Sequence, residues 1–336
     1  MQSLFYDRAT DVENALGLAQ QADTRYLGGG TNLLDLLKGD VEHASRLIDI
    51  NRSGLSKITA TANGGVRIGA AARNSDMAND ALIRQRYPLL SQALLSGASP
   101  QLRNMATAAG NLMQRTRCFY FTDTAFEKCN KRTPGSGCAA RDGANRIHAI
   151  LGSSDACIAT NPSDMSVALA ALDAVVVARS GRGERRIPIA VFHRLPADQP
   201  QFDTILGEDE LITAIELPAS PFAANAHYLK VRDRASYAFA LVSVAAAVAL
   251  RDGVVDRAAV ALGGVAHKPW RIAGAESALV GQRVGTPAFD HGAGVIADTL
   301  LAGAMGFKDN RFKIPLAHRS IVRALQIAAQ PTGAAA

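Results

Sequence analysis

The chain contains four cysteines, and all of them lie between Cys118 and Cys157 of a 336-residue sequence. Cysteines that serve as small core residues are scattered among apolar strands and helices, whereas these lie among charged residues and glycines. Cys138 directly follows the turn sequence Pro-Gly-Ser-Gly at residues 134–137. Thiols grouped in this way commonly form disulfides or a metal site. The fold is therefore expected to be organised around this segment.

The spacing of the four thiols is Cys-x10-Cys-x8-Cys-x18-Cys. Zinc sites usually contain closely paired cysteines, which this segment lacks. A [4Fe–4S] cluster also takes four thiolates, and a loop that wraps around it can space them irregularly. Residues 115–148 carry seven Lys or Arg and three acids. Because a cluster bound by four thiolates is anionic, this excess of positive charge suits it. The residues favour an iron–sulfur cluster and leave disulfides, zinc and unrelated thiols open.

The composition is that of a globular protein. The mean hydropathy is +0.04, and a chain of this length is expected to form two or three domains. The longest apolar run, residues 238–250, is too short for a membrane span, and the N-terminus has neither the basic nor the apolar region of a signal peptide. The net charge is +6, but only 5% of residues are aromatic and no basic stripe alternates with them. We therefore predict no membrane insertion, no signal peptide and no nucleic-acid binding.

A glycine-rich loop follows the first predicted helix and strand, residues 11–21 and 25–27. It reads Gly28-Gly29-Gly30-Thr31-Asn32-Leu33-Leu34. Glycines after a strand, with Thr and Asn opening a helix, form a loop whose backbone N–H groups can face a phosphate. The loop lacks the Walker A ending and does not fit Gly-x-Gly-x-x-Gly. For a lone glycine triplet, a structural turn is the alternative.

A second loop of similar composition lies at residues 101–112 and contains Ala106, Thr107, Gly110 and Asn111. Like the first loop, it pairs glycine and asparagine with a nearby threonine. Two such loops suggest the two sides of one diphosphate.

Ser163 and Asp164 precede an apolar helix predicted over residues 165–172. Either residue would make an ordinary helix N-cap. The functional alternative for Asp164 is a carboxylate that binds a ribose or ribityl hydroxyl.

Apolar periodicity predicts a mixed chain with a boundary at residues 218–221, where two prolines stand close together. The predicted strands are residues 46–50, 66–70, 174–178, 186–189, 211–217, 226–231, 240–250 and 254–262. The further predicted helices are residues 75–83, 87–96, 272–280, 292–305 and 318–328. No strand precedes Gly292 and Gly294, so their spacing indicates close helix packing rather than a dinucleotide site.

Four motifs together resemble the FAD-binding subunits of molybdenum hydroxylases, the family of xanthine dehydrogenase, aldehyde oxidoreductase and carbon monoxide dehydrogenase flavoproteins. They are Tyr-Leu-Gly-Gly-Gly-Thr-Asn-Leu-Leu at 26–34, Arg-Asn-Met-Ala-Thr-Ala-Ala-Gly-Asn-Leu at 103–112, Pro-Ser-Asp at 162–164 and Leu-Gly-Gly-Val-Ala-His-Lys-Pro at 262–269. The motifs occur in the family's order and cover nearly the whole chain.

The resemblance implies an α+β fold. A two-subdomain FAD-binding domain, of the PCMH and vanillyl-alcohol-oxidase type, would span residues 1–57 and 58–218. A C-terminal domain of the CO dehydrogenase flavoprotein type, with an antiparallel sheet and helices, would span residues 222–330. The cysteines lie in an insert at about residues 115–157, named the cysteine segment below.

The resemblance also implies the FAD-binding residues. Residues 27–34 (Leu27, Gly28, Gly29, Gly30, Thr31, Asn32, Leu33, Leu34) would wrap the pyrophosphate with backbone amides. Ala106, Thr107, Gly110 and Asn111 would hold its other side, with Ser163 and Asp164 at a hydroxyl of the sugar or ribityl part. Ile212 would pack on the isoalloxazine, and Lys230 would approach the flavin from the C-terminal domain.

The cysteine segment resembles that of the medium subunit of bacterial periplasmic aldehyde oxidoreductases, which carries a [4Fe–4S] cluster besides FAD. The likeness implies that Cys118, Cys129, Cys138 and Cys157 ligate such a cluster. A similar but less closely matching insert occurs in the corresponding subunit of 4-hydroxybenzoyl-CoA reductase.

The implied function is electron transfer within a heterotrimer, with no catalytic base in this chain. A large partner would carry the molybdenum cofactor and oxidise an aldehyde, and a small partner would carry two [2Fe–2S] clusters. Electrons would reach FAD and then an external acceptor. The alternatives are a subunit of a 4-hydroxybenzoyl-CoA reductase-like or xanthine dehydrogenase-like enzyme, or a stand-alone flavoenzyme with structural zinc. The expected location is the periplasm, by co-export with a signal-bearing partner, and the cytoplasm is the alternative.

Overall fold

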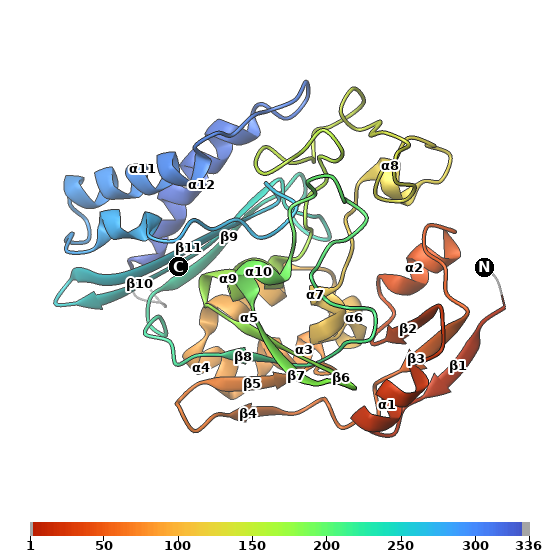
Figure 1. The fold of residues 1–336 in the computed structure, drawn as a ribbon. Helices are drawn as coiled ribbons and strands as arrows, with labels where there is room; N and C mark the ends of the chain where they lie inside the picture. The colour runs from red at the N-terminus through yellow and green to blue at the C-terminus, as the bar shows by residue number, and fades with distance from the viewer. Residues whose placement is uncertain (1–2, 331–336) are drawn as a thin grey trace.

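The computed structural model describes residues 3–330 and contains three sheets with helices packed on them. The fold is the predicted mixture of helices and sheets. The N-terminal and C-terminal sheets lie at opposite ends of the molecule, and the cysteine segment lies between them on one side (Figure 1). The predicted domain boundaries, at residues 57 and 218, fall between sheets.

The N-terminal sheet is parallel, with strand order β1-β3-β2. Its strands are β1 (Phe5–Arg8), β2 (Thr24–Leu27) and β3 (Arg46–Asp49), joined by helices α1 (Val12–Leu18) and α2 (Leu33–Lys38). Sequence periodicity missed β1 because its residues are mostly exposed and it forms an edge.

The central sheet has five antiparallel strands in the order β4-β5-β8-β6-β7. The strands are β4 (Ile58–Ala60), β5 (Val66–Gly69), β6 (Val175–Ser180), β7 (Gly183–Pro188) and β8 (Leu211–Leu217). The helices of this part are α3 (Asn74–Asn79), α4 (Ala81–Arg86), α5 (Pro88–Ser96), α6 (Pro100–Met105), α7 (Ala108–Leu112), α9 (Asp164–Ala171) and α10 (Ile189–Phe192). The helix predicted over residues 75–83 is wrong in its extent. Asp80 leaves helical geometry, and its carboxylate caps α4 by accepting from the Leu82 and Ile83 amides.

The C-terminal sheet is antiparallel, with strand order β11-β10-β9, and packs on two helices (Figure 1). Its elements are β9 (Ala226–Val231), β10 (Val242–Arg251), β11 (Val254–Gly263), α11 (Pro287–Leu301) and α12 (Lys313–Ala328). The helix predicted over residues 272–280 is only a short 3-10 helix, η1 (Ala275–Leu279). Helix α11 begins earlier than predicted because Thr286 caps it and Pro287 occupies its first turn.

Gly292 of α11 shows the close packing that its sequence context predicts. A Cβ there would lie 2.6 Å from the Ala278 carbonyl oxygen, whereas a Cβ at Gly294 would meet nothing within 4 Å. Only the first of the two glycines is therefore required by helix packing.

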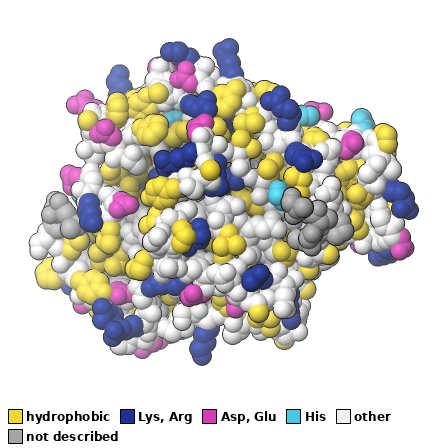
Figure 2. Space-filling model, turned by 180° about the vertical axis from the view of Figure 1, so that it is seen from behind, with side chains coloured by type: hydrophobic (Ala, Val, Ile, Leu, Met, Phe, Trp, Pro, Cys, Tyr) yellow, Lys and Arg dark blue, Asp and Glu magenta, His cyan; other side chains and the backbone are white. Residues whose placement is uncertain are grey.

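In the part of the chain that the structure describes, no helix is long and apolar enough to cross a membrane. On the face shown in Figure 2, Lys and Arg side chains are dispersed among hydrophobic and neutral ones.

Side chains at the start of α12 anchor the cysteine segment to the C-terminal domain. Asn310 Nδ2 donates to the carbonyl oxygens of His148 and Ala149 at 3.1 and 3.2 Å. Lys313 Nζ donates to the carbonyl oxygens of His148 and Gly264 at 2.8 and 2.5 Å. Lys313 is fully buried, and burial, with a smaller effect of Arg146, lowers the pKa of its ammonium to about 7.

Lys313 is expected to make stability depend on pH. The unfolded chain keeps this proton up to about pH 10.5, whereas the folded protein releases it near pH 7. The unfolded state therefore binds more protons between these values, and this residue's contribution to stability rises with pH. We expect urea unfolding to show wild type gaining stability relative to Lys313→Met from pH 7 to pH 10. A difference between the two proteins that stays constant over this range would contradict the prediction.

Candidate functional site

A large pocket, of about 740 Å³, lies between the two glycine loops, the start of α9 and the loop from β9 to β10. This volume is in the range of pockets that hold small molecules or cofactors. Of the predicted residues, the following line it: Thr31, Asn32, Ala106, Gly110, Asn111, Ser163, Asp164 and Lys230.

The glycines of the first loop bring the two loops together. A Cβ at Gly29 would lie 2.5 Å from the Met105 carbonyl carbon, and one at Gly28 would collide with the Thr107 hydroxyl. Gly30 has a positive φ of 74°. Gly28 and Gly29 therefore allow the close approach of one loop to the other, and Gly30 allows the left-handed backbone of the turn. The remaining predicted residues of this loop, Leu27, Leu33 and Leu34, pack on an apolar cluster around Leu47 and do not line the pocket.

The second loop is closed by local caps and joined to the start of α9. Thr107 is the N-cap of α7, and its hydroxyl accepts from the Gly110 amide at 3.2 Å. The Ser163 hydroxyl caps α9 and donates to Asn111 Oδ1 at 2.8 Å. Thr107 is buried and does not line the pocket, so its role is to hold the loop.

Asp164 is the first residue of α9, and two side chains of β9 hold its carboxylate. Lys230 Nζ lies 2.7 Å from Oδ2, and the Tyr228 hydroxyl donates to Oδ1 at 2.7 Å. The Lys230 and Asp164 side chains are 4% and 10% exposed. Burial and the nearby carboxylate raise the pKa of Tyr228 well above its usual value, so its hydroxyl stays a donor. A carboxylate has about four acceptor positions, so Asp164 can still accept from a ligand hydroxyl.

Replacing Lys230 with Met is expected to destabilise the protein by about 3 kcal/mol, because it leaves a buried carboxylate without its cation. Urea unfolding measures the loss. The double variant Lys230→Met with Asp164→Asn is the matched control. The amide introduced at position 164 is neutral, and its oxygen can still accept from the Tyr228 hydroxyl. It should recover much of the stability. A double variant as unstable as the single one would show that the ion pair is not the cause.

Ile212 does not reach the pocket. It lies in β8, pairs with Ala178 of β6 and is 3% exposed within the central core. The structure therefore places this predicted flavin contact in the core of the sheet and not in the pocket lining.

Asn74 is a pocket residue that sequence reasoning missed. It is 5% exposed, and its Oδ1 atom is buried with no hydrogen-bond partner in the protein. A buried acceptor without a partner is costly, so a donor on a bound ligand would satisfy it. The backbone N–H of Asn74 donates a hydrogen bond to the Ala106 carbonyl, which holds the residue in this position. No local sequence signal predicts this contact.

Three exposed aromatic side chains, Phe119, Tyr237 and Phe239, also line the pocket. The Arg117 guanidinium lies 5.1 Å from the Phe239 ring centre, and Arg234 lies 5.6 Å from that of Tyr237. Flat rings and cations at a pocket edge suit a flat, anionic ligand. The chemistry of the pocket therefore fits FAD.

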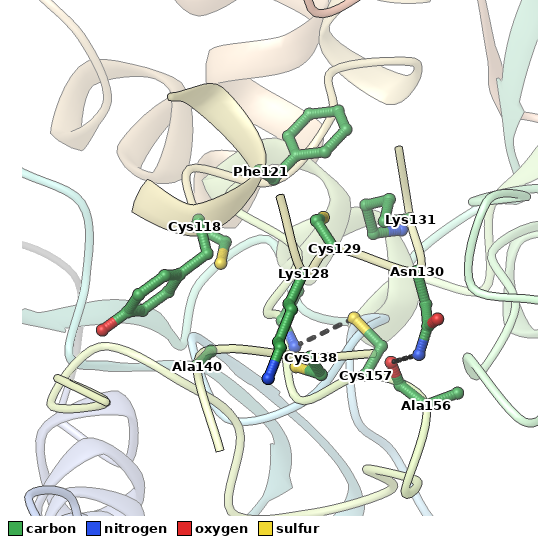
Figure 3. A pocket seen from close by; sticks show the side chains of 12 residues that line it. Cys118, Phe121, Lys128, Cys129, Asn130, Lys131, Cys138, Ala140, Ala156 and Cys157 are labelled. Carbon is green, nitrogen blue, oxygen red and sulfur yellow. Dashed lines mark hydrogen bonds between the residues drawn. The ribbon is translucent and has the colours of Figure 1, made fainter. Parts of the chain in front are cut away.

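The four cysteines line one small cavity of about 10 Å³, named the thiol pocket (Figure 3). Cys118 precedes the short helix α8 (Phe119–Thr122), and Cys129 and Cys138 face each other across an isolated antiparallel bridge. All four thiols are free, and Cys118, Cys129 and Cys157 are buried. The structure thus brings together all four residues that the sequence singled out.

Asn130 ties the cysteine-bearing loops to one another. Its Oδ1 accepts from the Gly137 amide at 2.8 Å, and its Nδ2 donates to the Ala156 carbonyl at 3.0 Å. The side chain therefore bridges the turn before Cys138 and the loop before Cys157.

Burial makes three of these thiols weak acids. It raises the pKa of Cys118 to about 12 and that of Cys157 to about 11, and it raises the pKa of Cys138 as well. Thiols of this kind are protonated and inert unless a metal holds them as thiolates. Within residues 3–330, no three His, Cys, Asp or Glu side chains are placed to hold a single metal ion. The thiols instead surround a common space (Figure 3).

A buried charge network lies beside the thiol pocket. Lys131 Nζ and Arg115 Nε each lie 2.7 Å from an oxygen of Asp203, and Arg115 also pairs with Glu42. Burial alone would raise the pKa of the Asp203 carboxyl, but Lys131 and Arg115 lower it well below its usual range. The network fixes the cysteine segment to the rest of the molecule with its charges paired.

The two pockets are neighbours that share two segments of chain. Arg117 and Phe119 line the large pocket, whereas Cys118 between them lines the thiol pocket. In the second segment, Cys157 lines the thiol pocket, and residues 160–164 line the large one. Two bound groups would therefore lie close together, as the short spacing from Cys157 to Asp164 predicts.

Comparisons with known proteins agree with this arrangement. Residues 2–220 match the family described as the FAD binding domain in molybdopterin dehydrogenase. Residues 227–328 match the CO dehydrogenase flavoprotein C-terminal domain.

Individual relatives and a solved structure cover most of the chain. The aldehyde oxidoreductase FAD-binding subunit PaoB of Escherichia coli is 50% identical over 97% of this chain and 98% of its own. The glyceraldehyde dehydrogenase medium chain of Sulfolobus acidocaldarius is 28% identical over 83% of this chain and 82% of its own. A chain of carbon monoxide dehydrogenase from Hydrogenophaga pseudoflava superposes with a TM-score of 0.74, 24% identity and 97% coverage of both chains, which shows a shared fold.

The large pocket, the two loops that build it and these matches lead to one conclusion. The chain belongs to the FAD-binding subunits of the molybdenum hydroxylases, and it is an oxidoreductase subunit of the aldehyde oxidoreductase type.

Proposed function

We propose that this chain is the FAD- and [4Fe–4S]-containing electron-transfer subunit of a heterotrimeric, molybdenum-dependent aldehyde oxidoreductase. The observation that carries the proposal is the pair of adjoining pockets, one fit for FAD and one surrounded by four thiols, joined by two short segments. The flavin and the cluster supply the redox chemistry when bound, and the protein fixes their position and potential.

The residues of the large pocket have distinct tasks in this proposal. Asn74 and Asn111 offer amide groups to the ligand, and Asp164 offers acceptor positions to a hydroxyl. Arg117 places positive charge in the pocket, which favours an anionic ligand and the gain of electrons by it, whereas the charge of Lys230 is paired with Asp164. The exposed aromatic rings at the edge offer flat surfaces to the ligand.

The thiol pocket supports a cubane cluster better than zinc. A zinc ion needs four ligands that converge at about 2.0–2.3 Å on one point. The four cysteines surround a space instead and offer the four thiolates that a [4Fe–4S] cluster takes. Cys157 Sγ accepts from the Ala159 amide at 3.5 Å, and N–H donors of this kind stabilise iron-bound thiolates.

The proposed partners are a large subunit with the molybdenum cofactor and a small subunit with two [2Fe–2S] clusters. Aldehyde oxidation would take place on the large subunit, with water as the oxygen source, and electrons would leave this chain to an external acceptor. The support is the 50% identity to a subunit named for an aldehyde oxidoreductase and the fold shared with carbon monoxide dehydrogenase.

Co-expression with the two candidate partners tests the proposal. The purified complex should contain molybdenum, iron and FAD, and aldehyde added without oxygen should bleach the flavin absorbance. Bleaching by xanthine instead of aldehydes would favour a xanthine dehydrogenase-like enzyme, whose FAD-binding subunit in Escherichia coli is 28% identical to this chain. Substrate turnover by this chain alone would indicate a stand-alone flavoenzyme.

We also propose that the complex acts in the periplasm and that this chain is exported while bound to a signal-bearing partner. The support is the likeness of the cysteine segment to that of periplasmic enzymes. Cell fractionation should find the chain in the cytoplasm when it is expressed alone and in the periplasm when it is expressed with its partners. Cytoplasmic location in both cases would favour the cytoplasmic alternative.

A further inference from the structure

One side chain of the C-terminal part of the cysteine segment contacts a cysteine sulfur. His148 Nε2 lies 3.1 Å from Cys118 Sγ, and His148 is 1% exposed. Among the hydrogen bonds of residues 3–330, only this one joins another side chain to a cysteine sulfur. The hydrogen bond to Cys157 Sγ comes from the backbone amide of Ala159.

The backbone of His148 is held in place from several sides. Its amide donates to the Asn145 carbonyl at 3.0 Å, and its carbonyl accepts from Asn310 and Lys313. Asn145, Asn310 and Lys313 are all fully buried. The backbone of His148 is therefore anchored to the C-terminal domain, which fixes the position from which its imidazole reaches Cys118.

The surroundings of the ring decide which nitrogen carries the proton. His148 Nδ1 is buried and has no hydrogen-bond partner. A proton on Nδ1 would be a buried donor without an acceptor, and it would leave the lone pair of Nε2 facing the lone pairs of the sulfur. A proton on Nε2 points instead at the sulfur, which is a good acceptor once it is a thiolate bound to iron.

We propose that His148 is a positioning residue that donates an Nε2–H hydrogen bond to the Cys118 thiolate and so raises the reduction potential of the cluster. The inference rests on the proposed function, because it needs the cluster to be present. A donor to a cluster sulfur stabilises the reduced, more negative state more than the oxidised state. Removing the donor should therefore lower the potential and leave the four ligands in place.

The test compares two variants of the full chain, purified without oxygen. His148→Met removes the donor at similar volume, and His148→Gln keeps an N–H group in reach. His193→Met is the matched control, since His193 is also buried with an unpartnered Nδ1 but bonds to the Leu112 carbonyl and to no cysteine. Iron content is measured first, followed by EPR-monitored redox titration.

A lower potential in His148→Met, with unchanged iron and with His148→Gln and His193→Met close to wild type, is the expected result. Equal potentials in wild type and His148→Met would overturn the inference. Iron missing from wild type itself would instead reject the cluster, and with it the proposed function.

A measurement on wild type covers the case in which His148→Met does not retain iron. Protein labelled with nitrogen-15 only in histidine should show a weak nitrogen-15 coupling to the reduced cluster in pulsed EPR, and labelled His148→Gln should lose it. A loaded wild-type cluster without this coupling would overturn the inference whatever the variants do.

Discussion

Replacing Cys129 with Ser is expected to reduce the iron content of the anaerobically purified chain from about four atoms to fewer than about three. The Cys129 thiol is buried and lines the thiol pocket with the other three cysteines. A cubane with three thiolates and one poor ligand loses iron or converts, so the low-temperature EPR signal of the reduced cluster should change or disappear. Iron and sulfide analysis and EPR measure both effects.

The same variant should keep some FAD, because the residues of the two glycine loops are unchanged. Thr124→Ala is the matched control, since Thr124 is exposed and lies between Cys118 and Cys129 in the same segment. It should keep its iron. Wild-type iron content in the Cys129→Ser variant would mean that this thiol is not a ligand.

Replacing Gly29 with Val is expected to give nearly flavin-free protein that is also less stable. The added side chain would meet the Met105 carbonyl group and the Ala106 Cα, both backbone atoms that cannot turn away. The two loops would separate, and the large pocket between them would lose its shape. Flavin absorbance per chain and urea unfolding measure the two effects.

The variant Gly110→Leu tests whether a blocked pocket alone, without displacement of the two loops, is enough to prevent flavin binding. A Cβ at Gly110 would meet only the Thr107 hydroxyl, at 3.0 Å, and Gly110 lines the pocket. This variant should lose flavin with a smaller loss of stability than Gly29→Val. Gly17→Ala, in helix α1 with nothing within 4 Å of the new Cβ, should keep flavin and gain up to about 1 kcal/mol. Full flavin occupancy in both Gly29→Val and Gly110→Leu would contradict the placement of FAD.

Local sequence signals predicted those parts of the fold that local physics decides. Alternating apolar residues marked β3, β8 and β11, and the Pro-rich break after β8 marked the start of the C-terminal part. Elements with exposed or short sequences were missed, as β1 and β4 show. The start of α11 was placed too late because Thr286 and Pro287 act as a cap and a first turn within a stretch that lacks apolar periodicity.

The site was predictable where one motif supplied several residues and unpredictable where the fold brought single residues together. Asn111 and Asp164 belong to recognisable motifs, and both line the large pocket. Asn74 reaches it only because a helix packs beside it, and Tyr228 meets Asp164 only because β9 lies next to α9, so no local pattern marked them. Ile212 lies in the sheet core and not in the pocket lining, and a short apolar motif cannot distinguish these two positions.

The sequence of the cysteine segment predicted a shared site but not the fold of the segment. Its spacing raised the expectation of one shared site, but no periodicity predicts how a loop with one short helix folds. The contacts that shape it are long-range, namely the Asn130 bridge, the Asp203 network and the anchors at Asn310 and Lys313. These contacts also explain why the thiol pocket lies against the large pocket.

The most direct test of the account is the cofactor content of the wild-type full chain, purified without oxygen. We predict about four irons and four acid-labile sulfides per chain, the content of one cubane, together with FAD and a low-temperature EPR signal after reduction. Because the chain is measured without its partners, no [2Fe–2S] cluster contributes. Fewer than about three irons per chain, with zinc or free thiols in their place, would contradict the account.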